Sequence, residues 1–184
     1  MDDRLFHSLN EWMSTLDQIW STVREELSDI PDPAGATRLI LRLSIAGILG
    51  GILGFEREAS GKSAGMRTHM LVSLGAALFV LVPQQAGASP ADMTRVFQGL
   101  VAGIGFLGAG AILKKKDGDE KEVQGLTTAA NIWMTAAIGA GVGMGREMTA
   151  IVSTGLALIV LALIPKMARS FQIRQHHDDQ QKQS

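Results

Sequence analysis

The stretch GLTTAANIWMTAAIGAGVGMG, residues 125–145, decides the fold because it contains no Asp, Glu, Lys or Arg. A helix needs about 20 predominantly apolar residues to cross a hydrocarbon core of about 30 Å, and this stretch is long enough. Its glycines would weaken a helix in water, but in lipid they let two helix backbones approach closely. The stretch therefore predicts a membrane-spanning helix that packs tightly against its neighbours.

Cutting the rest of the chain at its charged residues leaves four further apolar segments, at 39–55, 68–86, 96–113 and 148–164. An overall hydrophobic content of 46% does not exclude a soluble protein, but the uneven distribution of charge indicates a membrane protein. We therefore predict an all-α fold, a polytopic membrane helix bundle of about five transmembrane helices. The bundle is expected over residues 36–165, followed by a polar cytoplasmic tail over residues 166–184.

Residues 1–35 form an acidic segment with its own pattern. Apolar residues recur at alternating spacings of four and three, at Leu5, Leu9, Trp12, Leu16, Ile19 and Val23. This spacing predicts an amphipathic helix, ended by Pro31 and Pro33. Such a helix either lies on the outer membrane surface or packs against a partner subunit. The acidic polar face weakens the surface interpretation, because anionic lipid would repel it.

The orientation follows from the Lys and Arg residues in alternate connections. One side receives 11 of the 17, and the other receives six. The positive-inside rule then places the C-terminus in the cytoplasm and, with five spans, the N-terminus outside. We expect a multi-pass protein of a bacterial inner membrane.

Polar residues mark two places in the predicted bundle. Glu56 and Arg57 end the first apolar segment, and Arg67, Thr68 and His69 begin the second. The short connection predicts a helical hairpin that brings these groups to one depth, where opposite charges can pair. Deeper in the bundle we expect Gln98 and a polar face formed by Thr127, Asn131 and Thr135, which are spaced by four residues. Asn131 most needs an external partner, because a threonine hydroxyl can bond its own helix.

The glycines indicate close helix packing. We expect packing contacts at Gly50, Gly54, Gly99, Gly103, Gly105, Gly108 and Gly139. The alternative is that the alternate glycines over 139–145 permit a bend lining a polar cavity.

The sequence offers no catalytic constellation and no metal-ligand spacing within a span, so we expect no enzymatic activity. The 184 residues contain no cysteine, and the formal net charge of −1 predicts no nucleic-acid partner. We expect the lipid bilayer as a partner and a homo-oligomer, with a dimer favoured. No metal ligand is assigned.

Three motifs resemble the bacterial MgtC/SapB membrane protein family. The first is GFERE at 54–58 with AGMRTH at 64–69 and LVSLGAALF at 71–79; the second is GIGFLGAG at 103–110; the third is GLTTAANIW at 125–133 with AAIG at 136–139. The motifs occur in family order and cover roughly residues 39–164.

The resemblance implies an inner-membrane protein with an exposed N-terminus and a cytoplasmic C-terminus. Family members are associated with survival at low magnesium, with intracellular growth in pathogens and with restraint of the F-type ATP synthase. Many carry a soluble domain after the last helix, so with only residues 166–184 there we expect a short form. We expect no cofactor. The family name suggests magnesium transport, although family members are generally regarded as regulators.

Three functions compete at this point. The first is a regulator or adaptor that acts through helix–helix contacts with another membrane complex, such as F-type ATP synthase. The second is an oligomeric channel or transporter for magnesium, potassium or protons, in which Glu56, Gln98 and Asn131 face a shared path. The third is a purely structural membrane organiser.

Overall fold

The computed structural model describes residues 3–28, 32–117 and 120–162, and these residues are predominantly helical. The chain divides into two units, Met1–Ile40 and Leu41–Ser184. The predicted tail over 166–184 lies outside the described residues.

The first unit contains α1 (Asp3–Glu26), which confirms the predicted N-terminal helix. Apolar residues from Trp12 to Val23 are exposed, with 69% of Trp12 and 65% of Trp20 accessible. Pro33 begins the next helix instead of ending this one, because the fixed φ of proline suits the first helical position. Whether a membrane surface or a partner covers the apolar face stays a prediction.

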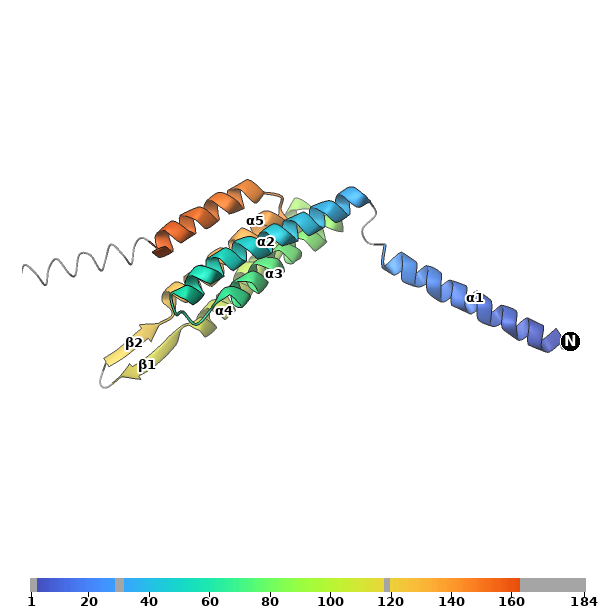
Figure 1. Cartoon of the computed structure of the whole chain (residues 1–184), viewed down its shortest axis with the longest axis horizontal. Helices are drawn as coiled ribbons and strands as arrows, with labels where there is room; N and C mark the ends of the chain where they lie inside the picture. The colour runs from blue at the N-terminus through green and yellow to red at the C-terminus, as the bar shows by residue number, and fades with distance from the viewer. Residues whose placement is uncertain (1–2, 29–31, 118–119, 163–184) are drawn as a thin grey trace, which may run out of the picture. The chain divides into compact units, whose positions relative to one another are not determined.

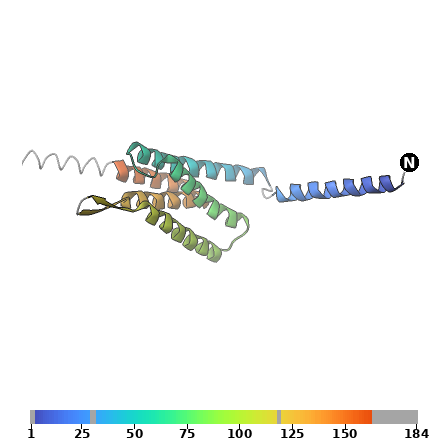
Figure 2. The ribbon, with the colours of Figure 1, turned by 90° about the horizontal axis from the view of Figure 1, so that it is seen from below.

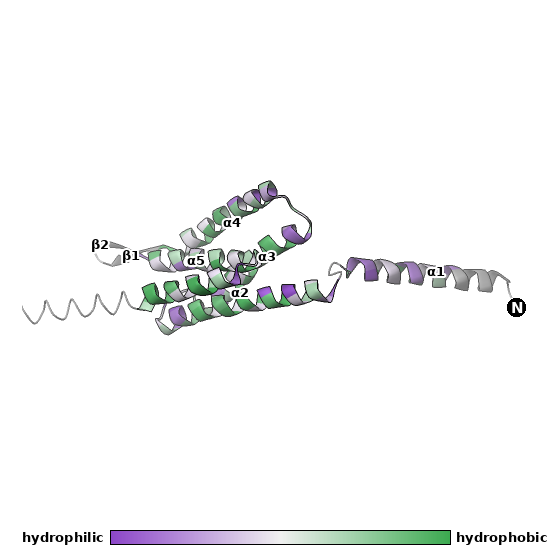
Figure 3. Ribbon diagram, turned by 90° about the horizontal axis from the view of Figure 1, so that it is seen from above, coloured by the Kyte–Doolittle hydropathy of each residue, from purple (hydrophilic) through white to green (hydrophobic). Residues whose placement is uncertain are grey.

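Each of the five predicted apolar segments is helical. The helices are α2 (Pro33–Ala59), α3 (Met66–Gln85), α4 (Pro90–Ala111), α5 (Leu126–Gly143) and a last helix described over Glu147–Ala162 (Figure 1). Hydrophobic residues recur along all of them (Figure 3). The helical class is confirmed.

Among the described helices, α2 and α3 are long and apolar enough to cross a membrane. The described parts of α4, α5 and the last helix do not meet that standard, so a bundle of five spans is not established. In α4 the polar residues Asp92, Arg95 and Gln98 occupy the first turns, and α5 carries Asn131 and three threonines. These groups lower the hydropathy of two helices that are otherwise apolar.

Local signals set the starts of α3 and α4. Ser89 and Asp92 form a capping box in which the Ser89 hydroxyl accepts from the Asp92 amide at 3.2 Å, and Pro90 follows at the first helical position. At α3 the preceding Gly65 offers no side chain, and the Glu58 carboxylate accepts from the Met66 amide at 2.9 Å. This bond ties the end of α2 to the beginning of α3, so the predicted hairpin has a defined geometry.

The helix α3 packs between α2 and α5, and glycines make both contacts close. A methyl group on Gly50 would lie 2.6 Å from the His69 carbonyl oxygen, and one on Gly54 would lie 2.5 Å from Met66 Cα. On the other side, a methyl group on Gly139 would collide with the Ser73 backbone. Gly50, Gly54 and Gly139 therefore occupy packing positions within the chain.

The glycines of α4 differ from this expectation. Nothing lies within 4 Å of a methyl group on Gly99, Gly103 or Gly105, and Gly108 makes only an ordinary contact with Ala129. Within one chain these three glycines do not bring helices together. The spacing of Gly99 and Gly103 gives them one face, but spacing alone does not say whether that face meets a helix of the same chain.

A β-hairpin that is not predicted from the sequence separates α4 from α5. Strand β1 (Leu113–Asp117) pairs antiparallel with β2 (Glu120–Gln124), with Leu113 opposite Gln124. The hairpin extends beyond the helices at one end of the bundle (Figures 1 and 2). Asp117-Gly118 is a hairpin turn signal, but the flanking residues are charged and lack the usual alternation of apolar residues.

Arg42, near the start of the first predicted span, finds partners inside the protein. Its Nε lies 3.3 Å from a carboxylate oxygen of Glu147, and its Nη1 donates to the Gly143 carbonyl at 3.2 Å. A cation at the C-terminus of α5 also interacts favourably with the helix dipole. This arginine therefore joins α2, α5 and the last helix.

We expect Gly139→Ala to destabilise the protein by about 1–3 kcal/mol, because the added methyl group would force α5 away from the Ser73 backbone. Gly103→Ala is the matched control, since its methyl group meets open space. Thermal unfolding in detergent, followed by circular dichroism, measures both variants. Equal stability of the two variants would contradict the packing described here.

Candidate functional site

A cluster of buried polar side chains lies where α2, α3 and α5 meet. Its members are Arg57 from α2, His69 and Ser73 from α3, and Thr128, Asn131 and Thr135 from α5. Each is at most 4% exposed. Because a buried polar group costs free energy unless it is hydrogen-bonded, the partners of these groups define the site.

His69 and Asn131 form the centre of the cluster. The His69 Nδ1 lies 2.9 Å from the Gly65 carbonyl oxygen, and its Nε2 lies 2.9 Å from Asn131 Nδ2. A carbonyl oxygen only accepts, so Nδ1 carries the ring proton. Nε2 of the neutral ring then accepts from the Asn131 amide group. The asparagine thus has the external partner that its position in an apolar helix required.

Arg57 is the buried cation of the cluster. Its Nη2 donates to Thr128 Oγ1 at 3.2 Å, which links the end of α2 to the first turn of α5. Arg57 forms no ion pair with the carboxylates of the described residues. Glu56, the residue before it, instead accepts from the Ser60 hydroxyl through Oε1. The expected pairing of opposite charges between Glu56, Arg57 and Arg67 is therefore wrong.

Three buried polar atoms have no hydrogen-bond partner among the described residues. They are Oε2 of Glu56, Nε of Arg57 and Oγ of Ser73. Glu56 uses its other oxygen to accept from the Ser60 hydroxyl at 2.9 Å. Ser73 is enclosed between Gly50 and Gly139, so the close packing that buries it also limits what can reach it.

The structure leaves five of the predicted site residues outside the cluster. Arg67, Thr68, Gln98 and Thr127 are all exposed. Arg67 and Thr68 lie in the first turn of α3, and Gln98 lies on α4. Glu56 is half-buried at the end of α2.

The polar face of α5 is rotated from the predicted one. Thr128, Asn131 and Thr135 are buried, whereas Thr127 is exposed. Seven residues make almost two full turns, so Thr128 and Thr135 share a face more closely than residues eight apart do. The two threonine hydroxyls have different partners. Thr128 accepts from Arg57, whereas Thr135 donates to the Asn131 carbonyl at 2.8 Å. The spacing of seven residues between Thr128 and Thr135 is the sequence signal that could have placed Thr128 on the buried face.

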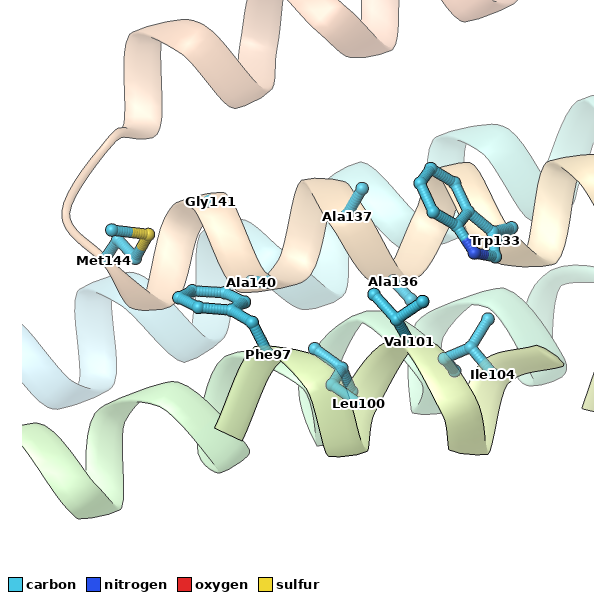
Figure 4. Close-up of a pocket in the computed structure, with 10 residues that line it drawn as sticks. All are labelled: Phe97, Leu100, Val101, Ile104, Trp133, Ala136, Ala137, Ala140, Gly141 and Met144. Atoms are coloured by element: carbon cyan, nitrogen blue, oxygen red, sulfur yellow. The ribbon is translucent and has the colours of Figure 1, made fainter. Parts of the chain in front are cut away.

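The bundle also has an apolar groove. A groove of about 240 Å³ runs between α4 and α5, and its lining includes Phe97, Leu100, Ile104, Trp133 and Met144 (Figure 4). No group of three or more His, Asp or Glu residues that could hold a metal ion occurs among the described residues. The candidate site is therefore the buried polar cluster.

Long apolar helices packed through glycines, with a polar cluster enclosed between them, define the class of helical membrane proteins. Residues 43–170 match the sequence profile of the MgtC family. The chain belongs to the MgtC family, and the resemblance noted in the sequence is confirmed.

Three relatives illustrate the match. Protein SrpB of Synechococcus elongatus is 42% identical over 74% of this chain and 80% of its own length. The Escherichia coli K12 protein named "Putative magnesium transporter YhiD" is 37% identical over 75% of this chain and 66% of its own length. Protein MgtC of Brucella abortus is 43% identical over 66% of this chain, but the match spans only 49% of that relative. No solved structure matches the chain.

We expect Asn131→Ala to lower the free energy of unfolding by about 1–3 kcal/mol, because His69 Nε2 would lose its donor in a buried site. Thr127→Val is the control on the exposed side of the same helix. Chemical denaturation in detergent compares the two variants. A larger loss for Thr127→Val would show that the sequence-predicted face, and not the one described here, is buried.

Proposed function

We propose that the chain is a multi-pass membrane protein that acts in magnesium homeostasis as a regulator or adaptor. Membership of the MgtC family supports this proposal, and so does the name of YhiD, which refers to magnesium transport. The observation that favours regulation over conduction is the buried Arg57, which is 3% exposed and lacks a carboxylate partner among the described residues.

A magnesium path through the cluster would meet unfavourable chemistry. Mg²⁺ prefers oxygen ligands in octahedral geometry and gives up water reluctantly. The cluster instead presents a guanidinium group and a histidine–asparagine pair, and the charge of Arg57 repels a nearby cation. Gln98 is exposed while Asn131 is buried, so these residues do not line one path with Glu56 inside a single chain.

The surface of the bundle supports action through helix–helix contacts. Large apolar side chains are exposed on several helices, including 81% of Phe106, 70% of Leu71 and 71% of Met148. Exposed apolar side chains of this kind suit lipid or a partner helix. The open glycines of α4 lie beside Leu107, so a partner helix could approach there. Self-association, with a dimer favoured, and contact with F-type ATP synthase are the two partnerships that we propose.

We further propose that all five bundle helices span a bacterial inner membrane, with the N-terminus outside and the C-terminus cytoplasmic. The distribution of Lys and Arg supports this orientation. The two helices α2 and α3 support the membrane location.

The test is purification of the full chain in mild detergent, together with growth of a deletion strain at low magnesium. We expect a co-purifying membrane complex and a growth or ATP-level defect on deletion. Gly103→Leu should lose the partner and the phenotype while keeping its abundance, because a Cβ at this position lies more than 4 Å from its neighbours among the described residues. Gly155→Leu on the last helix is the control, since it too has open space around it.

A homo-oligomer without any other partner, combined with normal growth and ATP levels after deletion, would refute the adaptor proposal. Magnesium, potassium or proton flux into liposomes containing only this protein would show instead that it conducts ions.

A further inference from the structure

A polar pocket of about 500 Å³ lies at the end of the bundle from which the hairpin extends. Three segments form it: the connection between α2 and α3, the end of α4, and the junction of β2 with α5. Its lining residues are Gly61, Lys62, Ser63, Ala111, Val123, Gln124, Gly125 and Thr128. Pockets of about 300–1,000 Å³ hold small ligands, so its volume suits one.

The first turn of α5 supplies backbone donors to this pocket. Gly125, at φ +92°, is the residue before the helix and carries no side chain that could cap it. The first intrahelical bond is donated by Ala129, to the Gly125 carbonyl at 2.9 Å, so the amides up to Thr128 precede the helical ladder. Free amides and the positive end of the helix dipole together favour an anion.

Arg57 gives independent evidence for a negatively charged ligand. It is 97% buried, since only 3% is exposed, and its guanidinium group reaches the pocket lining by donating to Thr128 Oγ1 at 3.2 Å. Its Nε has no partner among the described residues. A buried cation without a counter-ion is costly, and an anion in the adjoining pocket would relieve that cost.

Among the carboxylates that the structure describes, none forms an ion pair with Arg57, and Glu56 Oε2 has no hydrogen-bond partner. Glu56 accepts from the Ser60 hydroxyl, and Glu58 accepts from the Met66 amide at the start of α3. Lys62, in contrast, is exposed in the pocket lining and adds a second positive charge. The pocket thus combines an exposed lysine and the N-terminus of a helix, and the buried Arg57 donates to Thr128 in its lining.

We propose that this pocket binds a phosphoryl-type oxyanion. Thr128 and the amides of the first turn of α5 hold the oxygens, Lys62 attracts the anion at the opening, and Arg57 supplies the compensating charge from behind. The anion is either free inorganic phosphate or the phosphate of a lipid headgroup. The proposal is independent of the regulatory function, because it rests only on this pocket and its charges.

Binding of inorganic phosphate to the full chain in detergent, measured by isothermal titration calorimetry against chloride at equal ionic strength, tests the proposal. We expect Lys62→Gln to weaken binding about threefold and Arg57→Gln about tenfold or more, because charge-assisted hydrogen bonds are the stronger class. Arg95→Gln, which removes an exposed arginine on α4, should bind as the unchanged protein does. The Lys62 variant keeps the test decisive if Arg57→Gln does not fold.

Nanodiscs distinguish the two sources of phosphate. If a lipid headgroup occupies the pocket, phosphatidylglycerol should weaken phosphate binding relative to phosphatidylcholine, and native mass spectrometry should show phosphatidylglycerol retained by the unchanged protein but lost from Lys62→Gln. If free phosphate is the ligand, both lipids give the same affinity. Absence of phosphate binding together with no preferential lipid retention overturns the proposal. Equal losses in Lys62→Gln and Arg95→Gln also overturn it.

Discussion

The close approach of α3 to α2 on one side and to α5 on the other is the constraint on which the structure depends. Gly50 and Gly54 admit the backbone of α3 at its first turns, and Gly139 admits it at Ser73. Because these contacts leave no room for side chains, the relative height of the three helices is fixed. The short reach from His69 to Asn131 follows from that fixed height.

The polar cluster is a consequence of this packing and also a source of specificity. Within the three helices, His69 has a partner on each side and Thr135 bonds its own helix, so most polar atoms are paired internally. Arg57 differs, because its one hydrogen-bond partner among the described residues is a hydroxyl group and not a carboxylate. The charge of this cation distinguishes the end of the bundle where α2 meets α5 from the apolar parts of the bundle. The hairpin and the polar pocket lie at that same end.

The sequence predicts the helices and the family well, and the polar partners less well. The length of the apolar segments predicts every bundle helix. The need of Asn131 for a hydrogen-bond partner can also be predicted from the sequence. The sequence does not identify His69 as the partner of Asn131, because the two residues lie 62 positions apart. Their approach also depends on glycine contacts between helices. Spacing by four residues predicts Thr127 and not Thr128 on the buried face of α5. This spacing defines a helical face only loosely, so the prediction differs from the structure. The hairpin is not predicted because its residues are charged. The open face of α4 is not predicted because glycine spacing does not identify which helix, if any, the glycine face contacts.

The bond between the Glu58 carboxylate and the Met66 amide has a consequence for the order in which the protein is assembled. Contacts between α2 and α3 join residues close in sequence, so this hairpin can form as soon as both helices have been synthesised. At that moment α5 does not yet exist, and Arg57 and His69 lack Thr128 and Asn131 as partners. During translation these two side chains therefore lack their partners until Thr128 and Asn131 of α5 have been synthesised. The biogenesis of this protein thus includes an interval in which the insertion machinery or water has to accommodate them.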